Sequence, residues 1–198
     1  MNLIELIFST DFLYMWIRVA TPILLASLGA VICTKAGVVN LGLEGIMLIS
    51  ALAGVLGSAF GGSLWIGLLT GLLASVAVSA VFAYFHLVLK ANNVLCGTAV
   101  NTMASGLTVF VLQLATGEKG NSSSLKSFSF PNVDIPIIKD IPVLGGILSG
   151  HNALTYLALA MVVVIWFFLY KTPTGLRMRA VGENPNAASS VGQNVIKI

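Results

Sequence analysis

The chain has 198 residues, of which 57% are hydrophobic and only 9% are charged, and its mean hydropathy is +0.98. A soluble core of this length cannot bury so much apolar surface, so the composition excludes a water-soluble protein and indicates an all-α polytopic membrane protein. The net charge of +3 is small and lies mostly near the C-terminus, which indicates orientation in a membrane and no binding of nucleic acid.

The N-terminal segment is predicted to meet the membrane without being removed. It lacks a basic region and a small-residue cleavage site, so it does not resemble a cleaved signal peptide. Residues 3–17 are amphipathic enough to lie along the interface, with Tyr14 and Trp16 anchored at the headgroups. The first span is expected at residues 12–33, where Pro22 predicts a kink or a late helix start because proline lacks a backbone donor.

The second apolar segment, residues 36–60, contains a single charge, Glu44. A span needs about 20 apolar residues, and a helix starting at Ala36 places Glu44 about 12 Å deep in a hydrocarbon layer about 30 Å thick. A charge there costs roughly 3 kcal/mol, so it needs a partner, a cavity or a proton. Asn40, one helical turn earlier, shares its face. Two interpretations stay open for Glu44: an internal hydrogen bond that holds helices together, or a place beside a solute pathway.

A turn at Lys35 and Gly37, too short for a soluble loop, separates this segment from the first span. The two helices are therefore expected to form a tight hairpin, which either crosses the membrane fully or dips into it as a re-entrant pair. About five transmembrane or partly re-entrant helices are expected in all, the third at residues 64–89, the fourth at 94–116 and the fifth at 153–170.

Two of these spans carry one-sided patterns. On the third, small residues recur at every fourth position and predict close packing against another helix: Gly67, Gly71, Ser75, Ser79 and Ala83. On the fourth, small and polar residues share one stripe: Gly97, Thr98, Asn101, Thr102 and Ser105. Interhelical hydrogen bonds, each worth about 0.6 kcal/mol, explain this stripe as well as a solute path does, and for Asn101 both interpretations stay open.

Charge predicts which side of the membrane each connection faces. The tail, residues 171–198, holds these charges: Lys171, Arg177, Arg179 and Lys197 against Glu183. By the positive-inside rule the tail is cytoplasmic, and the polar, proline-containing stretch 117–152 is an extracytoplasmic loop. The same alternation places Lys35 and Lys90 inside and the N-terminus outside.

The tail also contains signals for a short helix. Asn184 can cap it, Pro185 suits its first position and Gly192 suits its end, which predicts one or two helical turns at the cytoplasmic surface. Cys33 and Cys96 lie in or at the edge of apolar segments without a metal-ligand spacing, so neither a metal nor another cofactor is expected.

Three stretches carry a family resemblance: GVVNLGLEGIM from Gly37, NVLCGTAVNTMASGL from Asn93, and TPTGLRMRAVGENPNAASSVGQNV from Thr172. In this order and spacing they resemble the membrane permease subunit of ABC importers of the nucleoside and simple-sugar branch, related to ribose permeases. The resemblance covers about residues 19–198. It implies that residues 1–198 form one multi-pass permease domain in a bacterial cell membrane. The implied partners are a second permease chain, ATP-hydrolysing subunits and an extracytoplasmic solute-binding lipoprotein.

The resemblance also implies roles for individual residues. Helices that match residues 40–47 and 97–105 line the solute path, and the segment that matches 175–192 couples the permease to the ATPase. The candidates along the path are Asn40, Glu44, Thr98, Asn101 and Ser105. The candidates for coupling are Arg177, Arg179, Glu183, Pro185, Ala187, Ala188 and Gly192. No stretch resembles a phosphate-binding loop, so the chain is not expected to be an enzyme that binds ATP itself.

Family members usually continue through further spans after the coupling segment, so the chain is expected to be a truncated or split permease with an incomplete permease fold. The alternative from another class is a secondary transporter that uses Glu44 as a proton or cation site. An intramembrane enzyme lacks support, because no paired acids, histidine cluster or nucleophile with a base stand at usable spacing.

Overall fold

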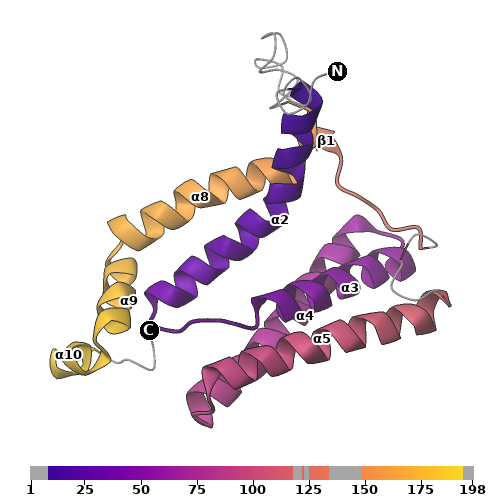
Figure 1. The fold of residues 1–198 in the computed structure, drawn as a ribbon. Helices are drawn as coiled ribbons and strands as arrows, with labels where there is room; N and C mark the ends of the chain where they lie inside the picture. Colours follow the sequence, from indigo (N-terminus) through magenta and orange to yellow (C-terminus); the bar gives the residue numbers. More distant parts are fainter. Residues whose placement is uncertain (1–8, 118–121, 123–124, 134–148, 194–198) are drawn as a thin grey trace. The chain divides into compact units, whose positions relative to one another are not determined.

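The computed structural model describes residues 9–117, 122, 125–133 and 149–193. The chain divides into two units, one formed by Met1–Val38 with Phe130–Ile198 and the other by Val39–Ser129. Five helices among the described residues are long and apolar enough to cross a membrane, in agreement with the predicted number (Figure 1). The chain is therefore an all-α polytopic membrane protein.

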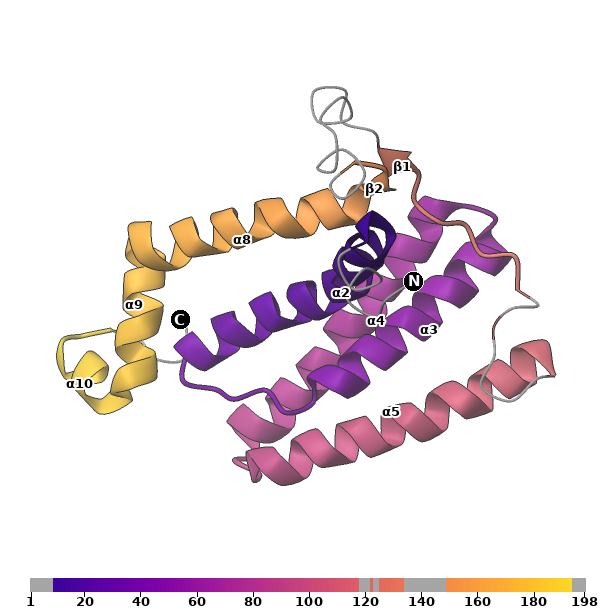
Figure 2. The ribbon, with the colours of Figure 1, turned by 45° about the horizontal axis from the view of Figure 1, so that its top comes forward.

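The first unit contains two spans and the helices of the tail. Its elements are α2 (Thr10–Lys35), β1 (Asn132–Val133), β2 (His151–Asn152), α8 (Ala153–Lys171), α9 (Pro173–Glu183) and α10 (Pro185–Ser190). α2 packs along α8, and α9 packs on α8, α2 and α10. Figure 2 shows α8 beside α2, with α9 turning away from the end of α8.

α2 begins earlier than the proline suggested. Ser9 caps it by accepting a hydrogen bond from the amide of Phe12 at 3.2 Å, and the helix runs through Pro22 to Lys35. The late start was therefore wrong. Residues 10–17 form the first part of the same helix, and their place along the interface stays a prediction. The rest of that expectation, at residues 3–8, lies outside the described residues. Figure 1 shows α2 changing direction along its length, as an internal proline predicts.

Tyr14 binds within its own unit. Its hydroxyl donates to the carbonyl of Gly150 at 2.7 Å, and its ring stacks on His151 with centroids 4.2 Å apart. His151 is only 2% exposed and pairs with Val133 in the antiparallel β1–β2 ladder. The aromatic stack thus joins α2 to the strand that precedes α8, a role that the predicted headgroup anchor did not include.

The second unit is formed by the other three spans. Its elements are α3 (Leu43–Gly61), α4 (Leu64–Ala83), the π-helix η1 (Tyr84–Val88) and α5 (Asn93–Thr116). α3 and α4 form a close hairpin, since a Cβ at Gly67 would lie 2.5 Å from the Cβ of Ser58 and 2.8 Å from the carbonyl of Gly54. A Cβ at Gly71 would lie 3.0 Å from the carbonyl of Ser50. The predicted close packing of the small-residue stripe is confirmed at these two glycines.

The helix that carries Glu44 starts later than predicted. α2 ends at Lys35 as expected, but α3 starts at Leu43, after the N-cap Gly42. Residues 36–42 are not helical, so Glu44 lies in the first turn of α3 and the depth counted from a helix start at Ala36 is wrong. Asn40 precedes the helix and shares no helical face with Glu44. The tight hairpin between the first two spans stays a prediction.

Candidate functional site

The start of α3 is completed by a side chain from another helix. Its N-cap, Gly42, has no side chain with which to bind the free amides of the first turn. Asn101 of α5 takes that place: its Oδ1 accepts from the amide of Gly45 at 2.8 Å, and its Nδ2 donates to the carbonyl of Leu41 at 3.0 Å. Of the two interpretations of Asn101, the interhelical hydrogen bond is the one that the structure contains.

Two further asparagines bind the non-helical segment before α3. Asn40 Oδ1 accepts from the amide of Gly42 at 3.0 Å, and Asn93 Nδ2 donates to the carbonyl of Val39. We call Asn40, Asn93 and Asn101 the asparagine clamp. Non-helical backbone in a membrane needs internal partners, because lipid offers none. The clamp supplies them for residues 39–45. The N-cap of α5 is the preceding residue, Asn92, whose Oδ1 accepts from the amide of Val94 at 2.9 Å.

Glycines let α5 approach the clamp. A Cβ at Gly97 would lie 2.6 Å from the Cβ of Leu41 and 3.1 Å from the amide nitrogen of Gly42. A Cβ at Gly45 would lie 2.8 Å from the carbonyl of Val100. Any larger residue at Gly97 or Gly45 would move the α5 backbone away from α3. The position of the Asn101 amide therefore depends on these two glycines.

Glu44 stands beside the clamp and is exposed. In the described part of the chain its carboxylate has no hydrogen bond or ion pair, so the internal hydrogen bond considered for it has no partner there. Its place in the first turn is favourable, because the positive end of the helix dipole stabilises a carboxylate. Thr98 and Ser105 are also exposed, and their hydroxyls donate to the carbonyls of Val94 at 2.9 Å and Thr102 at 3.0 Å.

The predicted short helix in the tail is confirmed as α10. Asn184 Oδ1 accepts from the amide of Ala187 at 3.1 Å, and Pro185 occupies the first turn. Gly192 follows the helix with φ +82°, a conformation that favours glycine. Ala188 is 7% exposed, whereas Ala187 is exposed. α10 packs on α9.

A second tail helix, α9, was missed. Its signal was present, because Thr172-Pro173 repeats the cap-and-proline pattern of Asn184-Pro185, and Thr172 Oγ1 accepts from the amide of Gly175 at 3.2 Å. Arg177, Arg179 and Glu183 all lie on α9. Arg177 and Glu183 are exposed.

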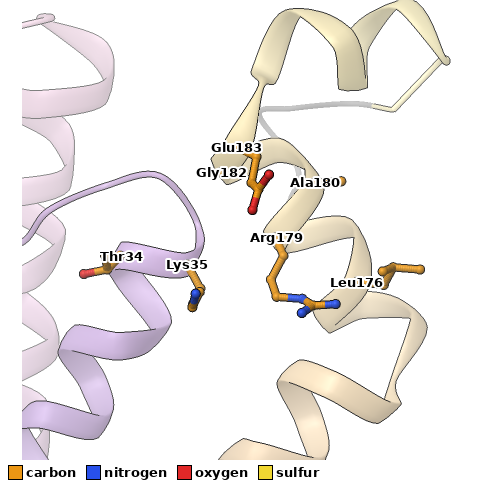
Figure 3. A pocket seen from close by; sticks show the side chains of 7 residues that line it. All are labelled: Thr34, Lys35, Leu176, Arg179, Ala180, Gly182 and Glu183. Carbon is orange, nitrogen blue, oxygen red and sulfur yellow. The ribbon is translucent and has the colours of Figure 1, made fainter.

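Arg179 is held by its own chain. Its guanidinium carbon lies 4.7 Å from the centroid of the Tyr170 ring on α8, a cation–π contact. A cavity of about 410 Å³ adjoins it between the end of α2 and α9, within the first unit. Figure 3 shows Lys35 on the α2 side of this cavity, facing Arg179 and Glu183 on the α9 side.

Residues 12–198 match the family described as the permease component of branched-chain amino acid transport systems. The chain belongs to this permease family. The permease is 39% identical over 186 residues to the guanosine ABC transporter permease NupQ of Bacillus subtilis, a match that covers 90% of the permease and 58% of NupQ. It is 35% identical over 201 residues to the nucleoside ABC transporter permease NupC of Lactococcus lactis, with 98% and 61% of the two chains covered.

A third relative comes from Haloferax volcanii and is provisionally named the glucose ABC transporter permease TsgC13. It is 37% identical to the permease over 194 residues, which cover 96% of the permease and 57% of the relative. No solved structure matches the permease. The permease therefore spans 57% to 61% of the length of these three relatives. All three relatives are named as permeases of ABC transporters.

Proposed function

We propose that the chain is the membrane-spanning permease subunit of an ATP-driven importer of nucleosides or related small sugars. Membership of the permease family carries the proposal, and the printed names of the relatives, which mention guanosine, nucleosides and glucose, supply the solute class. The importer would stand in a bacterial cell membrane. Its other parts would be an ATPase subunit, a second permease chain and an extracytoplasmic solute-binding lipoprotein.

The tail helices supply the surface for the ATPase. α10 projects from α9 as a short helix, and its exposed residues include Pro185 and Ala187. Arg177 adds an exposed charge on α9, whereas Arg179 rests on Tyr170. In this proposal α10 and Arg177 contact the ATPase, Arg179 holds α9 to α8 through Tyr170, and the buried Ala188 holds α10 in place. When ATP binding closes the partner subunits, the tail helices move with them.

The solute passes beside the start of α3. Glu44 is an unpaired hydrogen-bond acceptor in the described structure, and the hydroxyl groups of a sugar or a ribose are donors that suit it. The clamp asparagines fix the backbone that carries Glu44, and Asn40 and Asn101 each keep amide sites for a solute, because Asn40 uses only its Oδ1 and Asn101 uses one donor and one lone pair. Thr98 and Ser105 each retain hydroxyl lone pairs that a solute donor can use.

The test is a pull-down of the full-length gene product from its native membrane in mild detergent. An ATPase subunit should be recovered with it. The amount of ATPase recovered should fall in the variant Arg177→Glu and stay unchanged in Arg18→Glu, a charge reversal at an exposed position on α2. Uptake of guanosine, uridine and glucose into cells would then identify the solute. Recovery of the chain without an ATPase, together with uptake that an uncoupler abolishes while ATP is maintained, would overturn the proposal.

A further inference from the structure

α9 meets the rest of its unit backbone against backbone. A Cβ at Gly175 would lie 2.2 Å from the carbonyl oxygen of Phe168, and a Cβ at Gly182 would lie 2.2 Å from that of Lys35. The two glycines are two helical turns apart and therefore lie on one face of α9. The N-terminal part of α9 is thus fixed to the end of α8, and its C-terminal part touches the end of α2.

The second of these contacts involves another glycine. A Cβ at Gly182 would lie 2.9 Å from the amide nitrogen of Gly37, and a Cβ at Gly37 would lie 3.0 Å from the Cα of Gly182. Gly37 has φ +87° and lies in the turn that ends α2. No side chain lies between the two backbones at this point, so a displacement of α9 toward α2 cannot be absorbed by a rotamer change.

Beside this contact the two helices are apart. The cavity of about 410 Å³ is lined by Thr34 and Lys35 of α2 and by α9 residues that include Ala180 and Gly182 (Figure 3). A tight contact with open space next to it has the geometry of a pivot. α9 can move about the contact into the cavity together with the end of α8, to which Gly175 fixes it.

We infer that the contact between Gly37 and Gly182 is the pivot through which movement of α9 and α10 reaches the backbone that leads to Glu44. Gly37 continues directly into residues 38–42, and the asparagine clamp holds the following backbone, so a shift of Gly37 is passed along the chain to the start of α3. The inference rests on the proposed function, because it takes the tail helices as the part that the ATPase moves.

The test follows the segment itself and needs no identified solute. In the full-length product, purified with its ATPase, Cys33 and Cys96 are replaced by serine and Val39→Cys is introduced. Val39 is 51% exposed, so N-ethylmaleimide can report on its surroundings. The labelling rate is measured without nucleotide and with ATP and vanadate. Mutations along a coupled element typically change coupling by about 2- to 30-fold, and the nucleotide-dependent change in rate should fall by such a factor in two variants.

The first variant, Gly182→Val, forces the backbones apart, and its control is Gly29→Ala, because a Cβ at Gly29 has nothing within 4 Å. The second, Ala180→Trp, fills the cavity without entering the glycine contact, and its control is Ala180→Ser. If Gly182→Val fails to reach the membrane, the result for Ala180→Trp alone tests the pivot.

The pivot is overturned if the nucleotide-dependent change in labelling rate persists in both variants. If Gly182→Val does not reach the membrane, persistence of that change in Ala180→Trp overturns the pivot by itself. The lack of any change at Val39→Cys before the second substitution overturns it as well. If the ATPase does not copurify with the unmutated chain, the proposed function has failed instead.

Discussion

At the residue scale, Asn101 takes the role for α3 that the side chain of an N-cap residue normally has. Gly42 leaves the amides of the first turn without a cap, and Asn101 binds one of them from α5. This arrangement leaves the carboxylate of Glu44 without a structural task in the described residues. We propose that these two neighbouring polar residues have separate roles, the Asn101 amide in stability and the Glu44 carboxylate in the solute path.

We predict that Asn101→Leu destabilises the permease by about 1–3 kcal/mol, because the buried amide of Gly45 loses its acceptor and the carbonyl of Leu41 its donor. The measurement is the thermal unfolding midpoint of the full-length product in detergent. Ser105→Ala is the control, because the Ser105 hydroxyl donates only within its own helix in the described structure. Equal midpoints for the two variants would show that the clamp does not stabilise α3.

Glu44→Gln is predicted to leave that midpoint nearly unchanged and to weaken uptake. Glutamine keeps a neutral acceptor, so the loss is the difference between a charged and a neutral hydrogen bond, about 1–1.5 kcal/mol, and the half-saturating solute concentration should rise by about 5- to 10-fold. For Glu44→Asp, which keeps the charge on a shorter side chain, the half-saturating concentration should lie between those of the unmutated protein and Glu44→Gln. Uptake by Glu44→Gln with wild-type affinity would remove Glu44 from the solute pathway.

At the scale of elements, the two tail helices begin in the same way, with a capping side chain followed by proline: Thr172-Pro173 for α9 and Asn184-Pro185 for α10. The missing amide of proline costs nothing at this position, since no helical carbonyl is available to it. With six residues, α10 is too short to be stable by itself and depends on its cap and on packing of Ala188.

We therefore predict that Asn184→Ala weakens α10 by about 1 kcal/mol and lowers recovery of the ATPase in the pull-down. Asn184→Asp should keep the stability of α10 and the recovery of the ATPase, because a carboxylate can accept from the amide of Ala187 in the same way. The matched control is Asn186→Ala, an exposed asparagine on the same helix that does not cap it. Full recovery of the ATPase with Asn184→Ala would mean that an ordered α10 is not needed for binding.

Local signals made some elements predictable and left others out of reach. The number of spans, the end of α2 at Lys35 and the limits of α10 all follow from apolar run length, caps and glycines, which are local properties. The start of α3 does not, because residues 36–42 are as apolar as a helix would be. They are kept non-helical by Gly37, Gly42 and bonds to α5 that depend on the tertiary fold. The pairing of Arg179 with Tyr170 and of Tyr14 with His151 likewise joins residues whose proximity no sequence pattern indicates.

At the scale of the whole molecule, the spans are shared between two units, with α2 and α8 in the first and α3, α4 and α5 in the second. Five crossings connect opposite sides of a membrane only if each span, including both members of the α3–α4 hairpin, crosses fully. The distribution of lysine and arginine agrees with such crossings, since Lys35, Lys90 and the basic tail then fall on one side.

We predict this orientation from charge, and single cysteines in a background with Cys33→Ser and Cys96→Ser test it. In intact cells, an impermeant maleimide should label Ser63→Cys, between α3 and α4, and Lys126→Cys, after α5. Lys90→Cys should react only after permeabilisation, because the excess of basic residues holds its side of the membrane in the cytoplasm. If Ser63→Cys also needs permeabilisation while Lys126→Cys does not, the α3–α4 hairpin is re-entrant. The start of α3 and the Ser63 turn would then face the same side, and Glu44 would lie near the mouth of a pathway that other helices must complete.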